Sequence, residues 1–210
     1  MKLRRAFLLL VLGAAISALG QTSRPAAKPA KPAPQAQMSH QMSMAQPAMN
    51  SIAEIVDLQV TQMERQVMRL AEAMPEDKFD FNPTNLNLAD SRDPVRTFAG
   101  QLKHLATDNY DIWSPLTGDA IPAGITDVNG PPELKSRADI LKFVKDSFAL
   151  GHKAAATLTA RNVLEKLPFR GMEPARLYLA TYALIHDNDH CGQLAVYLRL
   201  AGITPPGSRK

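Results

Sequence analysis

The chain has 210 residues, a sequence pI of about 9.3 and a single cysteine. Six of its 24 basic residues but none of its 20 acidic residues lie in residues 1–50, so residues 51–210 hold 18 basic and 20 acidic residues, a formal charge of −2. This balance gives no electrostatic reason to expect a nucleic-acid partner, and one cysteine excludes an intramolecular disulfide framework.

Residues 1–20 have the parts of a cleavable signal peptide. Three basic residues lie among the first five, and an apolar run follows over residues 6–19. Small residues at Ala18 and Gly20 fit a cut before Gln21. The apolar run is too short to span a bilayer core of roughly 30 Å. We therefore expect an exported protein, periplasmic or secreted, with no stable membrane anchor after cleavage.

Residues 21–50 are rich in proline, alanine and glutamine and contain no aromatic residue, which predicts a disordered linker. Within it lies a cluster of potential copper(I) ligands: Met38, His40, Met42, Met44 and Met49. Thioether and imidazole ligands suit Cu(I). A flexible chain lacks a preorganised site, so we expect a tether and leave copper binding as the alternative.

The first predicted helix follows Ser51, a residue that can cap it, and ends at Pro75. Apolar residues recur at helical spacing throughout this segment. A connection rich in proline and asparagine comes next, and we expect Phe79 and Phe81 to pack it against the bundle. The second helix is predicted to be capped by Asp93, to carry Pro94 at its first position, and to end at Pro115.

Residues 115–133 are dense in glycine and proline and predict a loop. The third helix is predicted over residues 133–167, with a break near Gly151 or Arg161, and the fourth over residues 173–201. No segment alternates long enough to predict a strand. The expected fold is therefore all-α, a four-helix bundle formed by residues 51–210 as one domain.

Three histidines are placed to meet inside such a bundle. His186 and His190 are four residues apart on the fourth helix, so their side chains lie on one face, roughly 5–6 Å apart at Cβ. His104 lies midway along the second helix, and packed helix axes are roughly 8–10 Å apart. Three neutral imidazoles with one free position are the ligand set of a catalytic divalent metal. The alternative is a hydrogen-bonded polar layer in the core.

The sequence resembles the DinB-like (DinB/YfiT) superfamily of metal-dependent four-helix-bundle proteins over nearly all of residues 51–208. The resemblance rests on GQLKHLATDNYDIW in the second helix, on His186 and His190 followed by Gly192-Gln193, and on the closing VYLRLAGITPPGSR. It implies a bundle with one histidine from the second helix and two from the fourth, usually binding zinc, nickel or iron. By this resemblance His104, His186 and His190 are the ligands, and zinc is the first expectation.

Several residues near this motif have two interpretations each. Asp108 lies one turn after His104 and is either an acceptor or general base at the metal, or a surface charge. Gln193 lies on the face of His190 and either touches the site or bonds across the bundle. Cys191 points about 100° away from His190, which favours packing over ligation. His152 is interpreted as structural.

The remaining aromatic residues of this region are expected to form the core or a pocket wall: Tyr110, Trp113 and Tyr197. The segment H-D-N-D-H differs from the zinc-protease motif H-E-x-x-H by an aspartate at position 187, one methylene shorter than glutamate. No histidine or cysteine follows Cys191 to serve as a third protease ligand, so a protease is not expected.

An open three-histidine metal lowers the pKa of water toward about 7 or takes a thiolate as its fourth ligand. What the resemblance implies is divided: some relatives are thiol-dependent transferases, and many have no assigned reaction. Hydrolysis rests on the expected compartment alone, because reduced thiols are scarce outside the cytoplasm. The leading hypothesis is an exported metal-dependent enzyme, a hydrolase or thiol transferase, acting on an unknown small molecule. The alternative is a non-catalytic metal-binding or stress-response module that dimerises.

Overall fold

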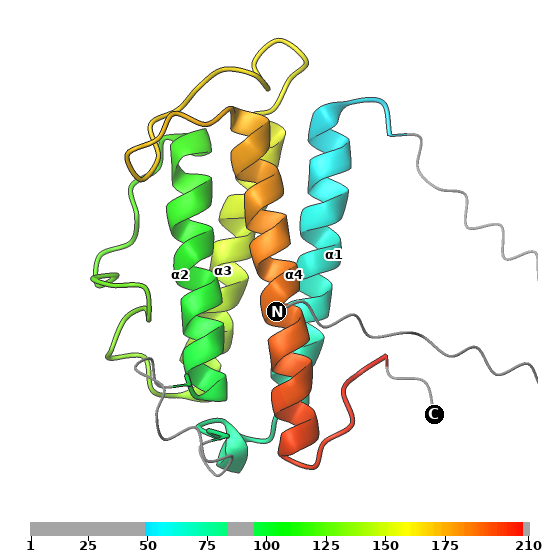
Figure 1. The fold of residues 1–210 in the computed structure, drawn as a ribbon, viewed down its shortest axis with the longest axis vertical. Helices are drawn as coiled ribbons and strands as arrows, with labels where there is room; N and C mark the ends of the chain where they lie inside the picture. The colour runs from blue at the N-terminus through cyan, green and yellow to red at the C-terminus, as the bar shows by residue number, and fades with distance from the viewer. Residues whose placement is uncertain (1–48, 84–94, 208–210) are drawn as a thin grey trace, which may run out of the picture. The chain divides into compact units, whose positions relative to one another are not determined.

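The computed structural model describes residues 49–83 and 95–207 (Figure 1). Three predictions lie outside the described residues. They are the signal peptide, almost all of the linker with its potential copper(I) ligands up to Met44, and the helix start at Asp93 and Pro94. Regular structure in the described ranges comprises four α-helices and one short 3-10 helix: α1 (Ile52–Ala73), η1 (Glu76–Lys78), α2 (Phe98–Thr117), α3 (Arg137–Ala156) and α4 (Arg176–Leu200).

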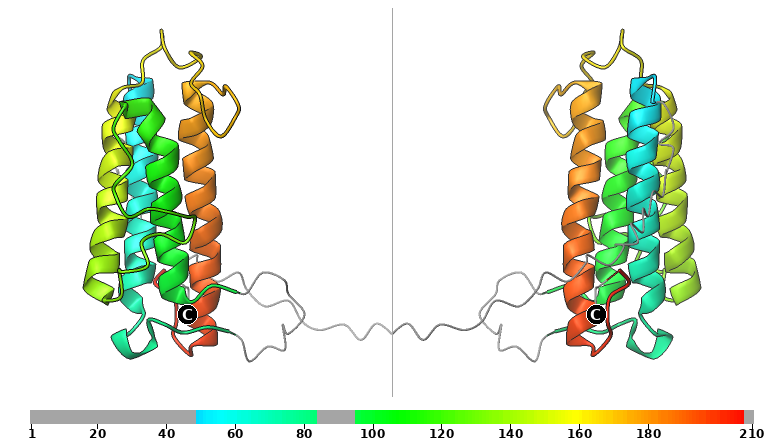
Figure 2. Two further views of the ribbon diagram at one scale, coloured as in Figure 1. Left: turned by 90° about the vertical axis from the view of Figure 1, so that its left-hand side faces the viewer. Right: turned by 90° about the vertical axis from the view of Figure 1, so that its right-hand side faces the viewer.

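The four α-helices form one bundle, as predicted from the sequence. Each helix packs against two neighbours, in the order α1, α3, α2, α4 around the bundle (Figures 1 and 2). The colours of Figure 1 show that α1 and α4 run in one direction and that α2 and α3 run in the other. Among the described residues, no helix has the length and apolarity needed to cross a membrane.

Helix α1 matches its predicted bounds. The side chain of Ser51 accepts a hydrogen bond from the amide of Glu54, and Glu54 bonds back to the amide of Ser51, which forms a capping box. Val56, Val60 and Val67 are buried on one face of the helix.

Helix α2 begins at Phe98, later than predicted. Thr97 caps it by accepting a hydrogen bond from the amide of Gly100, and residues 95–97 are not helical. The first two amides of the helix, those of Phe98 and Ala99, donate instead to the carbonyls of Phe81 and Phe79. The preceding connection thus accepts hydrogen bonds from two backbone amides that a longer helix would have bonded to its own carbonyls. The same contacts keep Phe79 in the core, as expected.

The predicted end of α2 at Pro115 is also wrong, because the helix continues to Thr117 with Leu116 buried. Pro115 removes only one backbone amide donor near the end of the helix. The packing of Leu116 in the core outweighs the free-energy cost of placing a proline in a helix. The third helix is shorter than predicted, running from Arg137 to Ala156 without a break at Gly151. A side chain at Gly151 would lie 3.1 Å from Nε1 of Trp113, so the glycine permits close packing of α3 on α2.

Residues 157–175 form a turn and a short hairpin, whereas the sequence predicts that the third helix continues to residue 167. Thr157, Thr159 and Asn162 hydrogen-bond to nearby backbone groups, a pattern that competes with helix formation. Two isolated antiparallel bridges, Lys166 to Ala175 and Phe169 to Met172, close the hairpin. Helix α4 therefore starts at Arg176 rather than at residue 173.

Because α2 and α3 run in the same direction, residues 118–136 must return along the bundle, and they do so beside α2 (Figure 1). Lys103 donates to the carbonyl of Pro131, and Arg96 donates to Asn129. Gly130 has a φ of 75°, and a Cβ there would lie 2.8 Å from Oγ1 of Thr107. Glycine thus lets this return loop lie directly against α2, where it reaches the site described next.

Candidate metal centre

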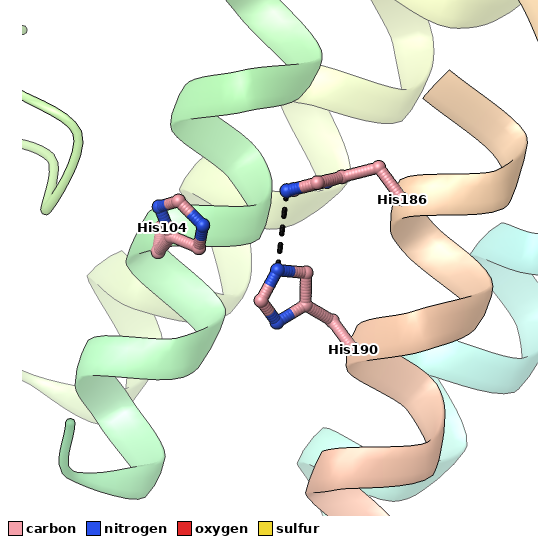
Figure 3. A group of neighbouring side chains, drawn as sticks. All are labelled: His104, His186 and His190. Carbon is pink, nitrogen blue, oxygen red and sulfur yellow. Dashed lines mark hydrogen bonds between the residues drawn. The ribbon is translucent and has the colours of Figure 1, made fainter. Parts of the chain in front are cut away.

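Three histidine side chains from two helices meet in the middle of the bundle. His104 projects from α2, while His186 and His190 project from α4 toward it (Figure 3). One nitrogen from each ring lies within 4.8 Å of the other two, an arrangement that could hold a metal ion. The Nε2 atoms of His186 and His190 are 3.1 Å apart.

The return loop orients His104. Nδ1 of His104 lies 2.6 Å from the backbone carbonyl oxygen of Val128. A carbonyl can only accept a hydrogen bond, so Nδ1 must carry the proton. Nε2 is then left with its lone pair as the donor atom for a metal, the usual arrangement for a metal-binding histidine.

A chain of two glutamines orients His190 in the same way. Gln193 donates its amide to the carboxylate of Asp189 at 2.8 Å, which leaves the oxygen of Gln193 to accept from Gln101 at 2.9 Å. Oε1 of Gln101 must then accept from Nδ1 of His190, 3.0 Å away. The carboxylate at the start of the chain therefore fixes the tautomer of His190, with Nε2 free to bind metal.

His186 is paired with Asp108. Nε2 of His186 lies 2.9 Å from Oδ2 of Asp108, and the same oxygen is 3.9 Å from Nε2 of His104. Nδ1 of His186 is buried and has no hydrogen-bond partner among the described residues. Asp108 itself is buried, so its interpretation as a surface charge is wrong, and its carboxylate lies beside two of the three histidines.

Arg170 holds Asp108 from the other side. Its Nη2 lies 2.8 Å from Oδ1 of Asp108, and its Nε lies 2.7 Å from Oδ2 of Asp111. Arg170 and Gly171 form the tip of the hairpin, and Arg170 has a φ of 47°, a conformation that a residue with a side chain seldom adopts. The turn geometry thus carries an energetic cost at the point where the hairpin touches the site.

The electrostatics favour neutral rings at His104 and His190 and an ionised carboxylate at Asp108. Burial, together with the adjacent rings of His186 and His104, lowers the pKa of His190 to about 4, and burial also lowers the pKa of His104. Burial opposes ionisation of Asp108, but its hydrogen bond with His186 and the positive charge of Arg170 lower its pKa to about 2. Near neutral pH His104 and His190 therefore offer lone pairs beside one negative charge, as a cation requires.

The donor set fits a divalent ion that prefers nitrogen ligands. Two nitrogens bound to one tetrahedral zinc ion are separated by about 3.3 Å, close to the 3.1 Å between the Nε2 atoms of His186 and His190. Nε2 of His186 donates to the carboxylate of Asp108 in this structure, so binding a metal through Nε2 requires its proton to move to Nδ1, which has no hydrogen-bond partner among the described residues. Imidazole nitrogen also suits nickel and iron, so this geometry does not select among the three metals.

The other residues singled out from the sequence do not join the cluster. Tyr110, Trp113 and Tyr197 are buried in the core. Cys191 is buried, and burial raises the pKa of its thiol to about 12. His152 on α3 instead contacts two carboxylates of α1, as a structural role predicts: its Nδ1 lies 2.6 Å from Asp57 and its Nε2 lies 3.3 Å from Glu64.

Sequence reasoning missed three groups that shape the centre: Gln101, the carbonyl of Val128, and Arg170. Gln101 lies three residues before His104, on the same face of α2, so helical spacing could have indicated it. Val128 and Arg170 lie in loops, 24 and 62 residues away from the groups that they contact, and no local pattern points to them.

Comparison with known proteins agrees with this architecture. The structure is similar to a DinB-like protein from Bacillus cereus ATCC 10987, with a TM-score of 0.58, 17% identity, and coverage of 76% of this chain and 98% of that one. It is also similar to a DinB-like protein from Bacillus subtilis, with a TM-score of 0.53, 18% identity, and coverage of 71% and 94%. None of the curated proteins matches the sequence. The DinB family matches residues 35–209, and the chain belongs to that family.

Proposed function

We propose that this protein is an exported enzyme that uses His104, His186 and His190 to bind one divalent metal ion, with zinc preferred over nickel or iron. The observation that carries the proposal is the convergence of one ring nitrogen from each of the three histidines, all within 4.8 Å of one another, in a site that solvent can reach. The side chains of His104 and His186 are 12% and 13% exposed, so water can reach the edge of the cluster. Its substrate is a small molecule of unknown identity.

A bound divalent ion would supply Lewis acidity at this site. Asp108 would hold an ionised oxygen beside the imidazoles of His186 and His104, ready to accept a proton from the attacking group. Arg170 would keep that carboxylate in place through Oδ1, which leaves Oδ2 facing the histidines. Hydrolysis suits an exported protein better than thiol transfer does, because reduced thiols are scarce outside the cytoplasm.

A non-catalytic metal-binding or stress-response module that dimerises is the second candidate. The position of Asp108 favours it, because Oδ2 lies near the donor nitrogens of two of the three histidines. If this oxygen takes the fourth coordination position, four protein ligands close the site, as in structural zinc centres.

Elemental analysis of the purified protein after reconstitution with zinc, nickel or iron tests the ligand set. We expect about one metal ion per chain, lost in His104→Ala and His190→Ala. His152→Ala is the matched control, since it removes an imidazole outside the cluster, and it should retain the metal. The absence of bound metal in the wild-type protein, or its retention in both ligand variants, would refute the proposed centre.

Cobalt-substituted protein separates the enzyme from the closed binding module. In an open site, added azide or a small thiol binds the cobalt and changes its visible absorption spectrum. A spectrum that changes in the wild-type protein supports the enzyme and justifies hydrolase and thiol-transfer assays. A spectrum that changes only after Asp108→Ala would show that Asp108 closes the site and would favour the binding module.

A further inference from the structure

A second concave site lies between α1 and α4, on another side of α4 from the histidines. This α1–α4 groove has a volume of about 670 Å³, and Pro205, Pro206 and Gly207 border it after the end of α4. The volume is within the usual range for a small-molecule site.

Arginine residues line both walls of the α1–α4 groove. Arg65 and Arg69, one turn apart, come from α1, and Arg199 comes from α4. No acidic residue of the described ranges lines the groove, although residues 51–210 as a whole have a formal charge of −2. In the described ranges none of the three arginines forms an ion pair, whereas Arg170 and Arg176 do. The groove thus gathers positive charge that no carboxylate of the described residues neutralises.

The remaining polar groups of the groove are uncharged amides. Gln62 and Gln66 extend the α1 wall, and Asn188 extends the α4 wall. Amide groups donate and accept hydrogen bonds, so they complement a ligand that carries both anionic and neutral polar parts. Apolar side chains, including that of Leu70, form the rest of the lining.

Gly192 keeps the groove open on the α4 side. A Cβ placed on this residue would meet nothing within 4 Å, so the space above it is free of protein atoms. Because successive residues are rotated by about 100° around a helix, Gly192 and Asn188 face a different direction from His186 and His190. The groove is therefore separate from the metal centre although both use α4.

We propose that the α1–α4 groove binds an anionic ligand through a phosphate group. Guanidinium groups bind phosphate oxygens with paired, charge-assisted hydrogen bonds, and three of them on facing walls suit a multiply charged group. A soluble phosphate ester and an anionic phospholipid headgroup share this chemistry. The experiment below distinguishes these two sources.

Pyrophosphate is the soluble probe, and its binding is measured by calorimetry on purified protein from which metal has been removed by chelation and dialysis. Removing metal eliminates binding at the histidine centre. We expect saturable binding of pyrophosphate. Each of the single variants Arg65→Gln and Arg69→Gln should weaken it roughly tenfold. Arg161→Gln is the matched control, because it makes the same change of charge at an exposed loop residue outside the groove, and it should bind as the wild-type protein does.

Gly192→Leu tests the cavity without altering any charge. Its side chain would enter the free space of the groove, and replacing a helical glycine does not weaken the helix. We expect at least a tenfold loss of pyrophosphate binding with unchanged helix content and thermal stability. Binding that persists in Gly192→Leu, or that falls equally in Arg161→Gln, would show a diffuse effect of surface charge and would overturn the proposal.

Vesicles of phosphatidylglycerol, compared with vesicles of phosphatidylcholine, supply the lipid arm. A lipid headgroup would be identified if the protein binds the anionic vesicles, if pyrophosphate competes with that binding, and if Gly192→Leu abolishes it. Pyrophosphate binding without vesicle binding would identify a soluble ligand. Binding of neither probe would overturn the proposal.

Discussion

Arg170 and Asp108 are joined across the site by a 2.8 Å ion pair, although 62 residues separate them in the chain. The pair connects the hairpin tip to α2 and leaves the second oxygen of Asp108 beside the imidazole of His186. One carboxylate is thus held by a fixed cation on one side and faces the candidate metal centre on the other. Its effect on metal binding can be measured.

Replacing Asp108 with asparagine should weaken metal binding roughly tenfold while leaving one metal ion per chain. The variant keeps the shape of the side chain but removes the negative charge nearest to the donor nitrogens. Affinity is measured by competition with a chelating dye. Asp111→Asn is the control, since Asp111 also pairs with Arg170 but forms no described contact with a histidine, and equal losses in the two variants would contradict this role of Asp108.

Replacing Gln101 with leucine should weaken metal binding by about 10–100-fold, because Nδ1 of His190 loses its acceptor and the ring loses its fixed tautomer. Gln193→Leu should have a smaller effect, because Gln193 acts only through Gln101. Nitrogen chemical shifts of the histidine rings, together with the metal affinity, test this order. A larger loss in Gln193→Leu would contradict the hydrogen-bonded chain.

His152 should stabilise the fold at acidic pH and lose this effect as the pH rises. Burial opposes its protonation, but hydrogen bonds to Asp57 and Glu64 outweigh burial and raise the pKa of the ring. A raised pKa means that the folded state holds the proton more tightly, so the stabilisation is complete below the unfolded pKa and disappears above the folded one.

Urea unfolding of the wild-type protein and of His152→Gln, both metal-free, tests this expectation across pH 5 to 9. The difference in the free energy of unfolding should be about 0.5–1 kcal/mol at the acidic end, since the pair is partly exposed to solvent, and should shrink above neutrality. A difference that grows with pH would contradict the assignment.

Replacing Asp187 with asparagine should stabilise the metal-free protein at pH 7 by about 1–2 kcal/mol. Asp187 is fully buried, neither of its carboxyl oxygens has a hydrogen-bond partner among the described residues, and burial raises its pKa well above the ordinary value. The unfolded chain releases this proton near pH 4 and the folded chain retains it, so wild-type stability falls as the pH rises above that value. Urea unfolding at pH 4 and pH 7 should show the gain only at the higher pH.

The sequence by itself determined the class of the fold, the first helix and the residues that can meet at the centre. The capping residue Ser51 and the spacing of His186 and His190 are local features, because a helix cap and a helical face each depend on neighbours within one turn. The family resemblance depended on the segments of the second and fourth helices that carry the histidines and on the C-terminal end of the chain, and the DinB family match agrees with it.

Tertiary structure decided the helix ends and the proton positions of two of the three histidines. Helix α2 begins at Phe98 because carbonyls from the preceding connection take its first amides, and it passes Pro115 because Leu116 is buried. The proton positions on His104 and His190 depend on Val128, in a distant loop, and on Gln101, from the facing helix. Such contacts arise only when the bundle closes, because they join groups that no sequence period brings together.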